Sequence, residues 1–367
     1  MTTSVAADAK ILLKVAGLTK HFGPRARFGR TRPVVHAADD VTFEIQRGQA
    51  LGLVGESGSG KSTIARCVLQ VESSDTGSVE LGGVDIAGLS RRRLRLKRRE
   101  MQAIFQDPAS SLNPRWTIGR IIAEPLKAHG WSKDRSEARV RELAEQVGLT
   151  PAQLRRMPYQ LSGGQQQRAG IARALALSPN LIVADEPLSA LDVSIQAQVL
   201  NLLIKLKSEM NLTFLFISHD LRVTRHLCEN IAVCYLGNIV EIGPADELLT
   251  NPRHPYTAAL ISAMPMTMSD VGRKSGQIVL AGDPPSPLDP PSGCRFRTRC
   301  FRAQPKCALS APPLDPSGAD HRAACFFPLE AGFLRSTAVA DLDVNDAATD
   351  PKVAADPTGN RTTDEVG

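Results

Sequence analysis

The stretch at residues 55–63, Gly-Glu-Ser-Gly-Ser-Gly-Lys-Ser-Thr, constrains this chain more than any other. It follows an apolar run at residues 50–54, typical of a buried strand, and precedes residues 64–69, which have helical spacing. Glycines at 55, 58 and 60 let successive backbone N–H groups turn inward around a polyphosphate, and the helix start adds its positive dipole end. Lys61 could then reach the β- and γ-phosphates, while the Ser62 hydroxyl could ligate Mg²⁺. This pattern favours a nucleotide site over a glycine-rich turn that binds nothing.

A pair of acidic residues follows a second apolar run. Residues 181–185 have the character of a buried strand, and the chain continues with Glu186 directly after Asp185. Burying two unpaired carboxylates would cost several kcal/mol, so a purely structural role is unfavourable. We expect Asp185 to hold the Mg²⁺ shell and Glu186 to lie beside the water that attacks the γ-phosphate.

Polar residues also follow two other predicted strands. Residues 101–105 are predicted to form a central strand that ends at Gln106, and residues 212–217 form one that ends at Ser218 and His219. An open α/β sheet presents its ligand-binding groups at the carboxyl ends of its strands. Gln106 could therefore reach Mg²⁺ or the attacking water, and His219 could face the same site. A lone histidine is otherwise usually a satisfied surface or core residue.

A second helix start could also bind an anion. Ser162 is a good N-cap, and residues 164–177 have the alanine, leucine and arginine content of a strong helix. The alternative is an ordinary capped helix. If both helix starts bind phosphate, one chain carries two such sites about a hundred residues apart.

The remaining elements predict an α/β protein. Residues 11–15 and 41–45 show strand character and predict an antiparallel edge sheet before the loop. The turn-rich piece at residues 21–25 contains Phe22, which could stack on an adenine ring, with Phe28 as the competing candidate. Residues 115–160 show helical periodicity and predict an inserted helical subdomain.

Composition narrows the compartment and the partners. The chain has 367 residues, 42% of them hydrophobic, and a net charge of +6. Seven basic residues at 91–99 have no interleaved aromatic residue, so they favour an exposed helix near an anionic or membrane-proximal surface over a nucleic-acid site. No apolar run approaches the ~20 residues that span a bilayer, and the N-terminus lacks the pattern of a secretory signal. We expect a cytosolic protein.

The seven cysteines fall into two groups. Three of them, Cys67, Cys228 and Cys234, lie in apolar surroundings and are expected in the core. The other four follow a stiff, proline-rich stretch at residues 282–293, and they are Cys294, Cys300, Cys307 and Cys325. Their spacing fits neither a zinc finger nor a ferredoxin motif, although four thiolates could still hold a metal that stabilises a small module.

Taken together, these motifs resemble the ATP-binding cassette (ABC) ATPases. The phosphate loop at residues 55–62, Gln106, the signature Leu-Ser-Gly-Gly-Gln at residues 161–165, the 185–186 acid pair, Ser-Ala-Leu-Asp at 189–192 and His219 occur in the family's order. The match covers about residues 8–250 and implies an ABC-type P-loop ATPase core with an antiparallel β edge subdomain and an inserted α-helical subdomain at about 115–175. A small cysteine-bearing extension at 251–330 and a disordered tail at 331–367 would follow.

The resemblance also implies how the site works. In that family two cassettes pair head to tail, and each ATP lies between one phosphate loop and the other signature. Glu186 would be the general base, while His219 would bind the γ-phosphate. Mg²⁺ would be held through Ser62, Gln106 and Asp185. The ATP contacts would be Phe22, Gly55, Ser57, Gly58, Gly60, Lys61, Ser62 and Thr63, and the partner's ATP would meet Ser162, Gly163, Gly164, Gln165 and Asp192.

A narrower resemblance is to the dipeptide, oligopeptide and nickel importer branch. It rests on residues 106–115, on Asn-Pro-Arg-His-Pro-Tyr-Thr-Ala-Ala-Leu at 251–260, and on the cysteine-bearing C-terminus. The branch implies import of di- or oligopeptides by a subunit peripheral to the cytoplasmic face of the membrane. Its partners would be a second ATPase, identical or paralogous, two permease subunits and an extracytoplasmic substrate-binding protein, with no nucleic acid.

Three questions stay open at this level. Nickel or another small solute is an alternative substrate. A soluble ABC ATPase acting on nucleic acid is a less favoured alternative function, because the chain carries a single cassette. Some members of the branch hold a [4Fe-4S] cluster in this region, so the four C-terminal cysteines could bind a cluster, zinc or no metal. The sequence does not identify the aromatic residue that stacks on adenine.

Overall fold

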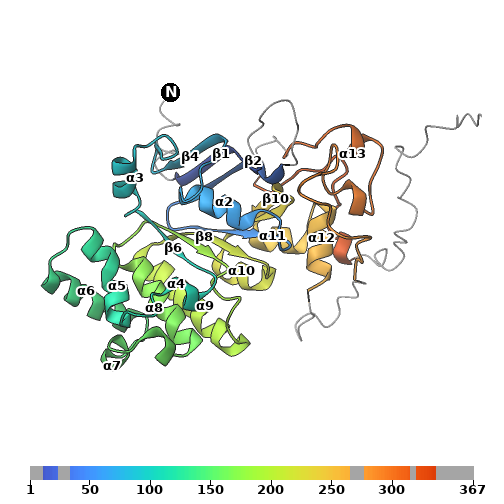
Figure 1. The fold of residues 1–367 in the computed structure, drawn as a ribbon. Helices are drawn as coiled ribbons and strands as arrows, with labels where there is room; N and C mark the ends of the chain where they lie inside the picture. The colour runs from blue at the N-terminus through green and yellow to red at the C-terminus, as the bar shows by residue number, and fades with distance from the viewer. Residues whose placement is uncertain (1–10, 24–33, 265–276, 315–319, 336–367) are drawn as a thin grey trace, which may run out of the picture.

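The computed structural model describes residues 11–23, 34–264, 277–314 and 320–335, which form two sheets with helices around them (Figure 1). One sheet is antiparallel, in the order β2-β1-β4-β5, and the other has the order β11-β10-β9-β3-β8-β7-β6, parallel from β9 to β6. The strands are β1 (Ile11–Phe22), β2 (Val35–Gln46), β3 (Ala50–Val54), β4 (Thr76–Leu81), β5 (Val84–Asp85), β6 (Met101–Ile104), β7 (Leu181–Asp185), β8 (Thr213–Ser218), β9 (Asn230–Tyr235), β10 (Asn238–Pro244) and β11 (Arg322–Ala323).

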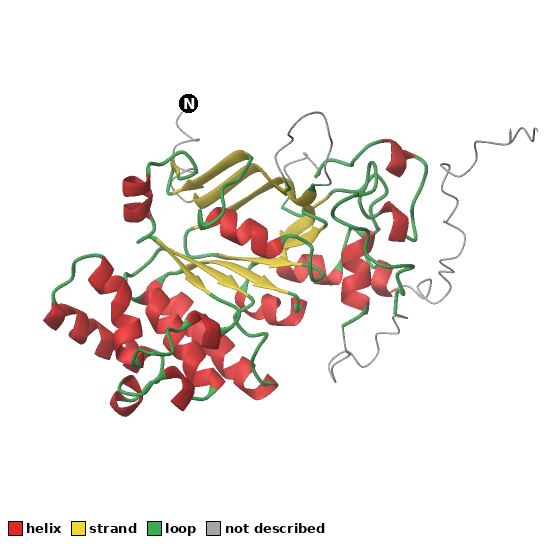
Figure 2. Cartoon of the chain, viewed as in Figure 1, coloured by secondary structure: helices red, strands yellow, loops and turns green. Residues whose placement is uncertain are grey.

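Helices lie on both faces of the parallel sheet (Figure 2). None of those in the described segments is both long and apolar enough to cross a bilayer. The helices are α2 (Lys61–Val68), α3 (Arg91–Lys97), α4 (Pro108–Ser111), α5 (Ile118–Ala128), α6 (Lys133–Gln146), α7 (Pro151–Leu154), α8 (Gly163–Leu175), α9 (Val193–Met210), α10 (Leu221–Leu227), α11 (Ala245–Thr250), α12 (Pro255–Ser262) and α13 (Lys306–Leu309), with 3₁₀ turns η1 (Pro158–Gln160), η3 (Arg297–Arg299) and η4 (Phe333–Arg335).

Strand β8 shows how the core is divided. All six of its residues are buried, as expected for a parallel strand covered on both faces. Because side chains alternate along a strand, Phe214 and Phe216 join the hydrophobic core shared with α5, α8 and α9. Leu215 and Ile217 point the other way, into the core shared with α2 and the antiparallel sheet. Helices α2 and α8 therefore pack against opposite faces of the parallel sheet.

The structure confirms the α/β class, the antiparallel sheet and the inserted helices, with three corrections. The antiparallel sheet is separate and gains β4 and β5 from beyond the phosphate loop. His21 and Phe22 end strand β1 and do not lie in a turn. The β1–β2 pairing contains several register shifts but continues as far as Phe22. Strand β6 is at the edge of its sheet, so Gln106 follows an edge strand and not a central one.

The predicted basic helix is α3, which buries none of its residues. The described residues beyond 250 include some that pack on the parallel sheet. Strand β11 pairs with β10, and the carboxylate of Glu241 on β10 is 0% exposed. This carboxylate accepts backbone N–H groups of Arg253 and His254, at 2.7 and 2.9 Å, and lies 2.7 Å from Nε2 of His321.

Part of the predicted tail belongs to this packing. Residues 333–335 form η4, and the Phe333 ring stacks on that of Phe301 with centroids 5.9 Å apart. Residues 336–367 and Phe28 lie outside the described residues.

Candidate functional site

The phosphate loop connects β3 to α2, as the sequence predicted. Gly60 caps α2 with a φ of 102°, in the left-handed region that favours glycine, and a Cβ there would collide with the carbonyl oxygen of Ala37 on β2. Strand β2 of the antiparallel sheet therefore borders the loop directly. Glycine is required here both by the backbone conformation and by the close approach of β2.

Lys61 is buried at the centre of this loop, with 4% of its surface exposed. Its Nζ donates to the carbonyl oxygens of Gly55 and Glu56, both at 2.8 Å, and to Oγ of Ser59 at 3.3 Å. Burial lowers the pKa of Lys61, and neighbouring anionic groups such as Glu186 oppose that shift. A phosphate oxygen would offer the ammonium a charged acceptor in place of neutral ones, which makes a stronger bond.

Ser62 and Asp185 form the pair expected around Mg²⁺. The Ser62 hydroxyl, in the first turn of α2, donates to Oδ1 of Asp185, at the end of β7, over 3.0 Å. Burial raises the pKa of Asp185 and the charge of Glu186 adds to the rise, while the hydrogen bond from Ser62 opposes it. Hydroxyl and carboxylate oxygens are the protein ligands that Mg²⁺ prefers.

Glu186 lies at the centre of a second group of residues. Its Oε2 accepts a hydrogen bond from Nε2 of Gln106 at 3.1 Å and lies 3.6 Å from Nδ1 of His219. Glu186 and His219 also line one pocket at the ends of β7 and β8. The backbone of Glu186 has a φ of 45°, which is rare for a residue with a side chain and typically occurs at functional sites. The structure therefore brings the three predicted catalytic side chains together.

The signature lies on the other face of the sheet. Ser162 and Gln165 form a reciprocal capping box at the start of α8, with Gln165 N–H donating to Ser162 Oγ and Ser162 N–H to Gln165 Oε1. A Cβ on Gly164 would approach Cγ2 of Ile195 on α9 to 2.6 Å, and Asp192 is the N-cap of that helix. Because α8 and α2 pack on opposite faces, the signature of this chain does not cover its own phosphate loop.

The predicted adenine contact lies at the rim of the antiparallel sheet. Phe22 is 39% exposed and pairs in register with Val35, at the start of the strand that borders the loop. Lys20 Nζ lies 5.1 Å from the centroid of its ring. The ring is thus accessible on the side of the molecule where β2 meets the phosphate loop.

Sequence reasoning missed two residues that contact the phosphate loop. The backbone N–H of Glu56 donates to the hydroxyl of Tyr256 at 3.0 Å, and Arg299 Nη1 lies 3.0 Å from Glu56 Oε2. Tyr256 belongs to the stretch that identified the importer branch, and Arg299 directly precedes Cys300. A tyrosine and an arginine in those motifs were the available signals, but neither indicates its contact across the fold.

The four C-terminal cysteines converge as predicted. They line one pocket together with His254 and Phe296, and we call it the four-cysteine pocket. Burial raises the pKa of Cys300 to about 12 and that of Cys325 to about 11. All seven cysteines are free, and the three predicted core cysteines are buried.

Two protein families match the chain. Residues 38–189 match the ABC transporter family, and residues 240–307 match the oligopeptide/dipeptide transporter C-terminal region. The first range includes the phosphate loop, the signature and the acid pair, whereas the second includes Tyr256, Arg299 and three of the clustered cysteines.

Whole-chain relatives agree with these matches. The chain is 48% identical over 335 residues to a probable peptide ABC transporter ATP-binding protein of Sinorhizobium fredii, covering 90% of this chain and 94% of that protein. It is 47% identical over 319 residues to the oligopeptide transport ATP-binding protein OppF of Salmonella typhimurium, covering 86% and 96%.

A solved structure extends the agreement to the fold. The dimeric ATP-binding cassette MJ0796 bound to ADP and Pi superposes with a TM-score of 0.57 at 28% identity, covering 64% of this chain and 99% of that one. The chain is therefore an ABC ATPase, a member of the ABC transporter family whose cassette carries the oligopeptide/dipeptide transporter C-terminal region.

Proposed function

We propose that this chain hydrolyses ATP to drive the import of di- and oligopeptides. The observation that carries the proposal is the convergence of Gln106 and His219 on the carboxylate of Glu186, next to the Ser62–Asp185 pair. The peptide assignment is supported by relatives 47–49% identical over both the cassette and the extension.

The chemistry follows from the positions of these side chains. Glu186 takes a proton from a water, whose oxygen forms a bond to the γ-phosphorus as the bond to the β–γ bridging oxygen breaks and ADP leaves with that electron pair. His219 contacts the γ-phosphate, and Gln106 orients Glu186 and the water. Ser62 and Asp185 would hold Mg²⁺, which neutralises phosphate charge.

We further propose the remaining contacts with ATP. Phe22 stacks on the base, and Lys61 binds the β- and γ-phosphates. The backbone of the phosphate loop supplies the other contacts on this side of the nucleotide. Residues 162–165 and Asp192 face the ATP held by a second cassette, which the opposite-face placement of the signature requires.

The assembly would be an importer with this chain at the cytoplasmic face of the membrane. A second ATPase, two permease subunits and an extracytoplasmic substrate-binding protein complete it. We divide the chain into an ATPase domain at 8–250, with its helical subdomain at about 115–175, and a C-terminal extension at 251–330, to which residues 331–335 are added because η4 packs there.

The four-cysteine pocket is proposed to hold a [4Fe-4S] cluster through Cys294, Cys300, Cys307 and Cys325. Among the described residues, no three of these sulfur atoms lie within 4.8 Å of one another. A tetrahedral zinc with ~2.3 Å bonds would hold its sulfurs about 3.8 Å apart, so zinc binding would require these side chains to move closer together. Visible absorbance and bound iron in anaerobically purified protein, both lost in Cys300→Ala, would support the cluster. Iron-free wild-type protein would exclude it.

Replacing Glu186 tests the catalytic assignment. Glu186→Gln should retain ATP binding while turnover falls by about 10²–10⁴-fold, the usual contribution of a general base. Glu209→Gln, an exposed change on α9, is the matched control and should leave turnover unchanged. Near wild-type turnover in Glu186→Gln would remove Glu186 as the base.

Reconstitution tests the substrate. In proteoliposomes that contain the whole importer, peptides of two to about five residues delivered by the binding protein should stimulate ATP hydrolysis and accumulate inside. Stimulation by nickel and not by peptides would replace the peptide assignment with the metal one.

A further inference from the structure

One arginine of the short segment between Cys294 and Cys300 contacts the phosphate loop. Arg299 Nη1 donates to both carboxylate oxygens of Glu56, at 3.3 and 3.0 Å. The Arg299 side chain is 9% exposed and that of Glu56 is 28% exposed. Because the pair is largely shielded from water, its bonds are stronger than those of a surface ion pair.

Glu56 is also held through its backbone. Its N–H donates to the hydroxyl of Tyr256, a fully buried residue of the extension. Its carbonyl oxygen accepts a hydrogen bond from Nζ of Lys61 at 2.8 Å. Glu56 therefore lies between the extension and the lysine that binds the phosphates. A displacement of Arg299 would shift the carbonyl group on which the Lys61 ammonium rests.

Phe296 fixes the same segment in the core. It is 1% exposed, and its ring centroid lies 5.3 Å from those of Tyr235 and Tyr256. Val54, which directly precedes the phosphate loop, belongs to the same hydrophobic cluster. The segment is thus packed as one piece with the residues that border the loop.

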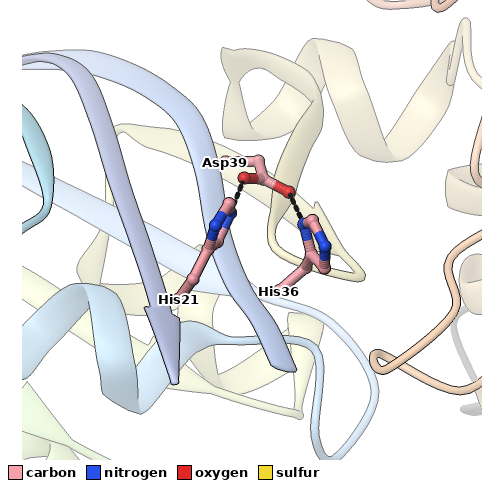
Figure 3. A group of neighbouring side chains, drawn as sticks. All are labelled: His21, His36 and Asp39. Carbon is pink, nitrogen blue, oxygen red and sulfur yellow. Dashed lines mark hydrogen bonds and ion pairs between the residues drawn. The ribbon is translucent and has the colours of Figure 1, made fainter. Parts of the chain in front are cut away.

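A second arginine of this segment contacts strand β2, which borders the loop. Arg295 pairs with the carboxylate of Asp39, which also contacts His21 and His36 (Figure 3). The ligand atoms of the two histidines and Asp39 lie within 4.8 Å of one another, as in a metal site. The Arg295 guanidinium, however, already supplies the positive charge at this carboxylate, so the cluster is better explained as a second anchor.

This anchor is linked to the phosphate loop by backbone bonds. Asp39 N–H donates to the Gly237 carbonyl at 2.9 Å, and Gly237 N–H donates to the Ser59 carbonyl at 2.8 Å. Arg295 itself also donates to the Leu236 carbonyl. Two arginines flanked by Cys294 and Cys300 are thus connected to the phosphate loop, Arg299 by direct contact and Arg295 through Asp39 and Gly237.

We propose that Arg299 is a positioning residue for the phosphate loop. Through Arg299, a change in the four-cysteine pocket, such as the loss of a cysteine or the binding of a group there, alters the affinity of the cassette for ATP. The inference rests on the proposed binding of ATP at this loop. It does not require a particular group in the pocket, because Cys294 and Cys300 delimit the segment that carries both arginines.

The first test measures binding of the fluorescent nucleotide MANT-ATP to the purified full chain. Arg299→Met should weaken binding about tenfold, since hydrogen bonds between charged groups are among the strongest in proteins. Turnover at saturating ATP should stay within about twofold of wild type, because Arg299 does not touch the reacting atoms. Arg299→Lys should recover part of the affinity, since it keeps the charge but loses the planar fork.

Arg225→Met is the control. The guanidinium of Arg225 pairs with Asp246 on α11 and not with a residue of the loop, and Arg225 does not line the four-cysteine pocket. This variant should bind MANT-ATP as wild type does. Glu56→Gln removes the pair from the loop side and should also weaken binding about tenfold, which tests the pair independently of how well the arginine variant folds.

The second test asks whether the pocket acts through the arginine. Cys300→Ser should weaken MANT-ATP binding by about threefold in the wild-type background and have no further effect in the Arg299→Met background, as expected for coupled residues. Additive effects of the two changes would overturn the role of the pocket.

The outcomes separate this inference from the proposed function. Wild-type affinity in both Arg299→Met and Glu56→Gln, with normal binding by the parent chain, would overturn the positioning role alone. Failure of the wild-type chain to bind MANT-ATP would instead contradict the proposed function.

Discussion

A single buried carboxylate fastens the C-terminal extension to the parallel sheet. Glu241 on β10 accepts the backbone N–H groups of Arg253 and His254 just before α12 begins, and it contacts the ring of His321 next to β11. These partners come from two separate parts of the extension. An isolated buried charge would be costly, but three donors compensate it here.

Glu241→Gln should therefore lower the free energy of unfolding by about 2–3 kcal/mol. The amide has no negative charge, and its NH₂ group would face one of the N–H groups that now donate to the carboxylate. Urea denaturation of the full chain measures this change. Glu247→Gln, an exposed carboxylate on α11, is the control and should change stability by less than about 0.5 kcal/mol. Equal stability of the two variants would show that Glu241 does not anchor the extension.

At the scale of elements, the approach of α8 to α9 depends on a glycine. Gly164 lies in the first turn of α8, and a Cβ there would lie 2.6 Å from Cγ2 of Ile195 on α9. Ile195 is β-branched and cannot easily rotate away. This contact sets the position of the signature relative to Asp192, the N-cap of α9.

The effect of Gly164→Ala on stability combines a steric cost from Ile195 with a gain in helix propensity, so its sign depends on residue 195. Gly164→Ala should destabilise the chain by roughly 1–2 kcal/mol, because overpacking exceeds the gain in helix propensity of up to about 1 kcal/mol. In the Ile195→Ala background the steric conflict is gone, so the same change should be neutral or stabilising. Chemical denaturation of the four proteins in this cycle measures the reversal. Equal effects in both backgrounds would contradict the proposed contact.

The comparison of sequence with structure has a physical pattern at this scale. The parallel strands β3, β7 and β8 were predictable because they are mostly apolar runs, with the phosphate-loop glycine directly after β3 and polar residues at the ends of β7 and β8. Strands β4 and β5 were not, since both are short, β4 begins with two exposed residues and both residues of β5 are exposed. The Gly23-Pro24 pair suggested a turn that begins before Phe22, but pairing with β2 carries the strand through that residue.

Sheet order and distant contacts lay beyond any local pattern. Gln106 was expected after a central strand, but β6 is an edge strand. Strand order is set by tertiary packing, so the local sequence does not reveal it. The contact of Gln106 with Glu186 nevertheless agrees with the predicted role. Arg299 and Glu56 are separated by 243 positions, and no local periodicity relates two such residues.

At the scale of the whole molecule, the two helix starts that we propose to bind phosphate lie on opposite faces of one sheet. The start of α2 carries the buried Lys61, while the start of α8 is exposed at Ser162 and Gly163. Neighbouring Val193, on α9, is an apolar side chain that is 82% exposed. Within one chain these two helix starts cannot close on the same nucleotide, so a complete site requires a second cassette.

Ser162→Arg should separate nucleotide binding from pairing. In the Glu186→Gln background, which retains ATP, the chain mixed with its partner cassette should pair when ATP is added, whereas the Ser162→Arg variant should stay monomeric. MANT-ATP affinity of the isolated variant should remain within about twofold of the parent, because Ser162 lies away from the phosphate loop of its own chain. Thr150→Arg, at the exposed N-cap of α7, removes a capping box of the same kind and should pair normally. Sedimentation velocity with and without ATP measures the pairing.

ATP-dependent pairing of Ser162→Arg would exclude the signature from the interface, and loss of MANT-ATP binding in that variant would contradict the opposite-face arrangement.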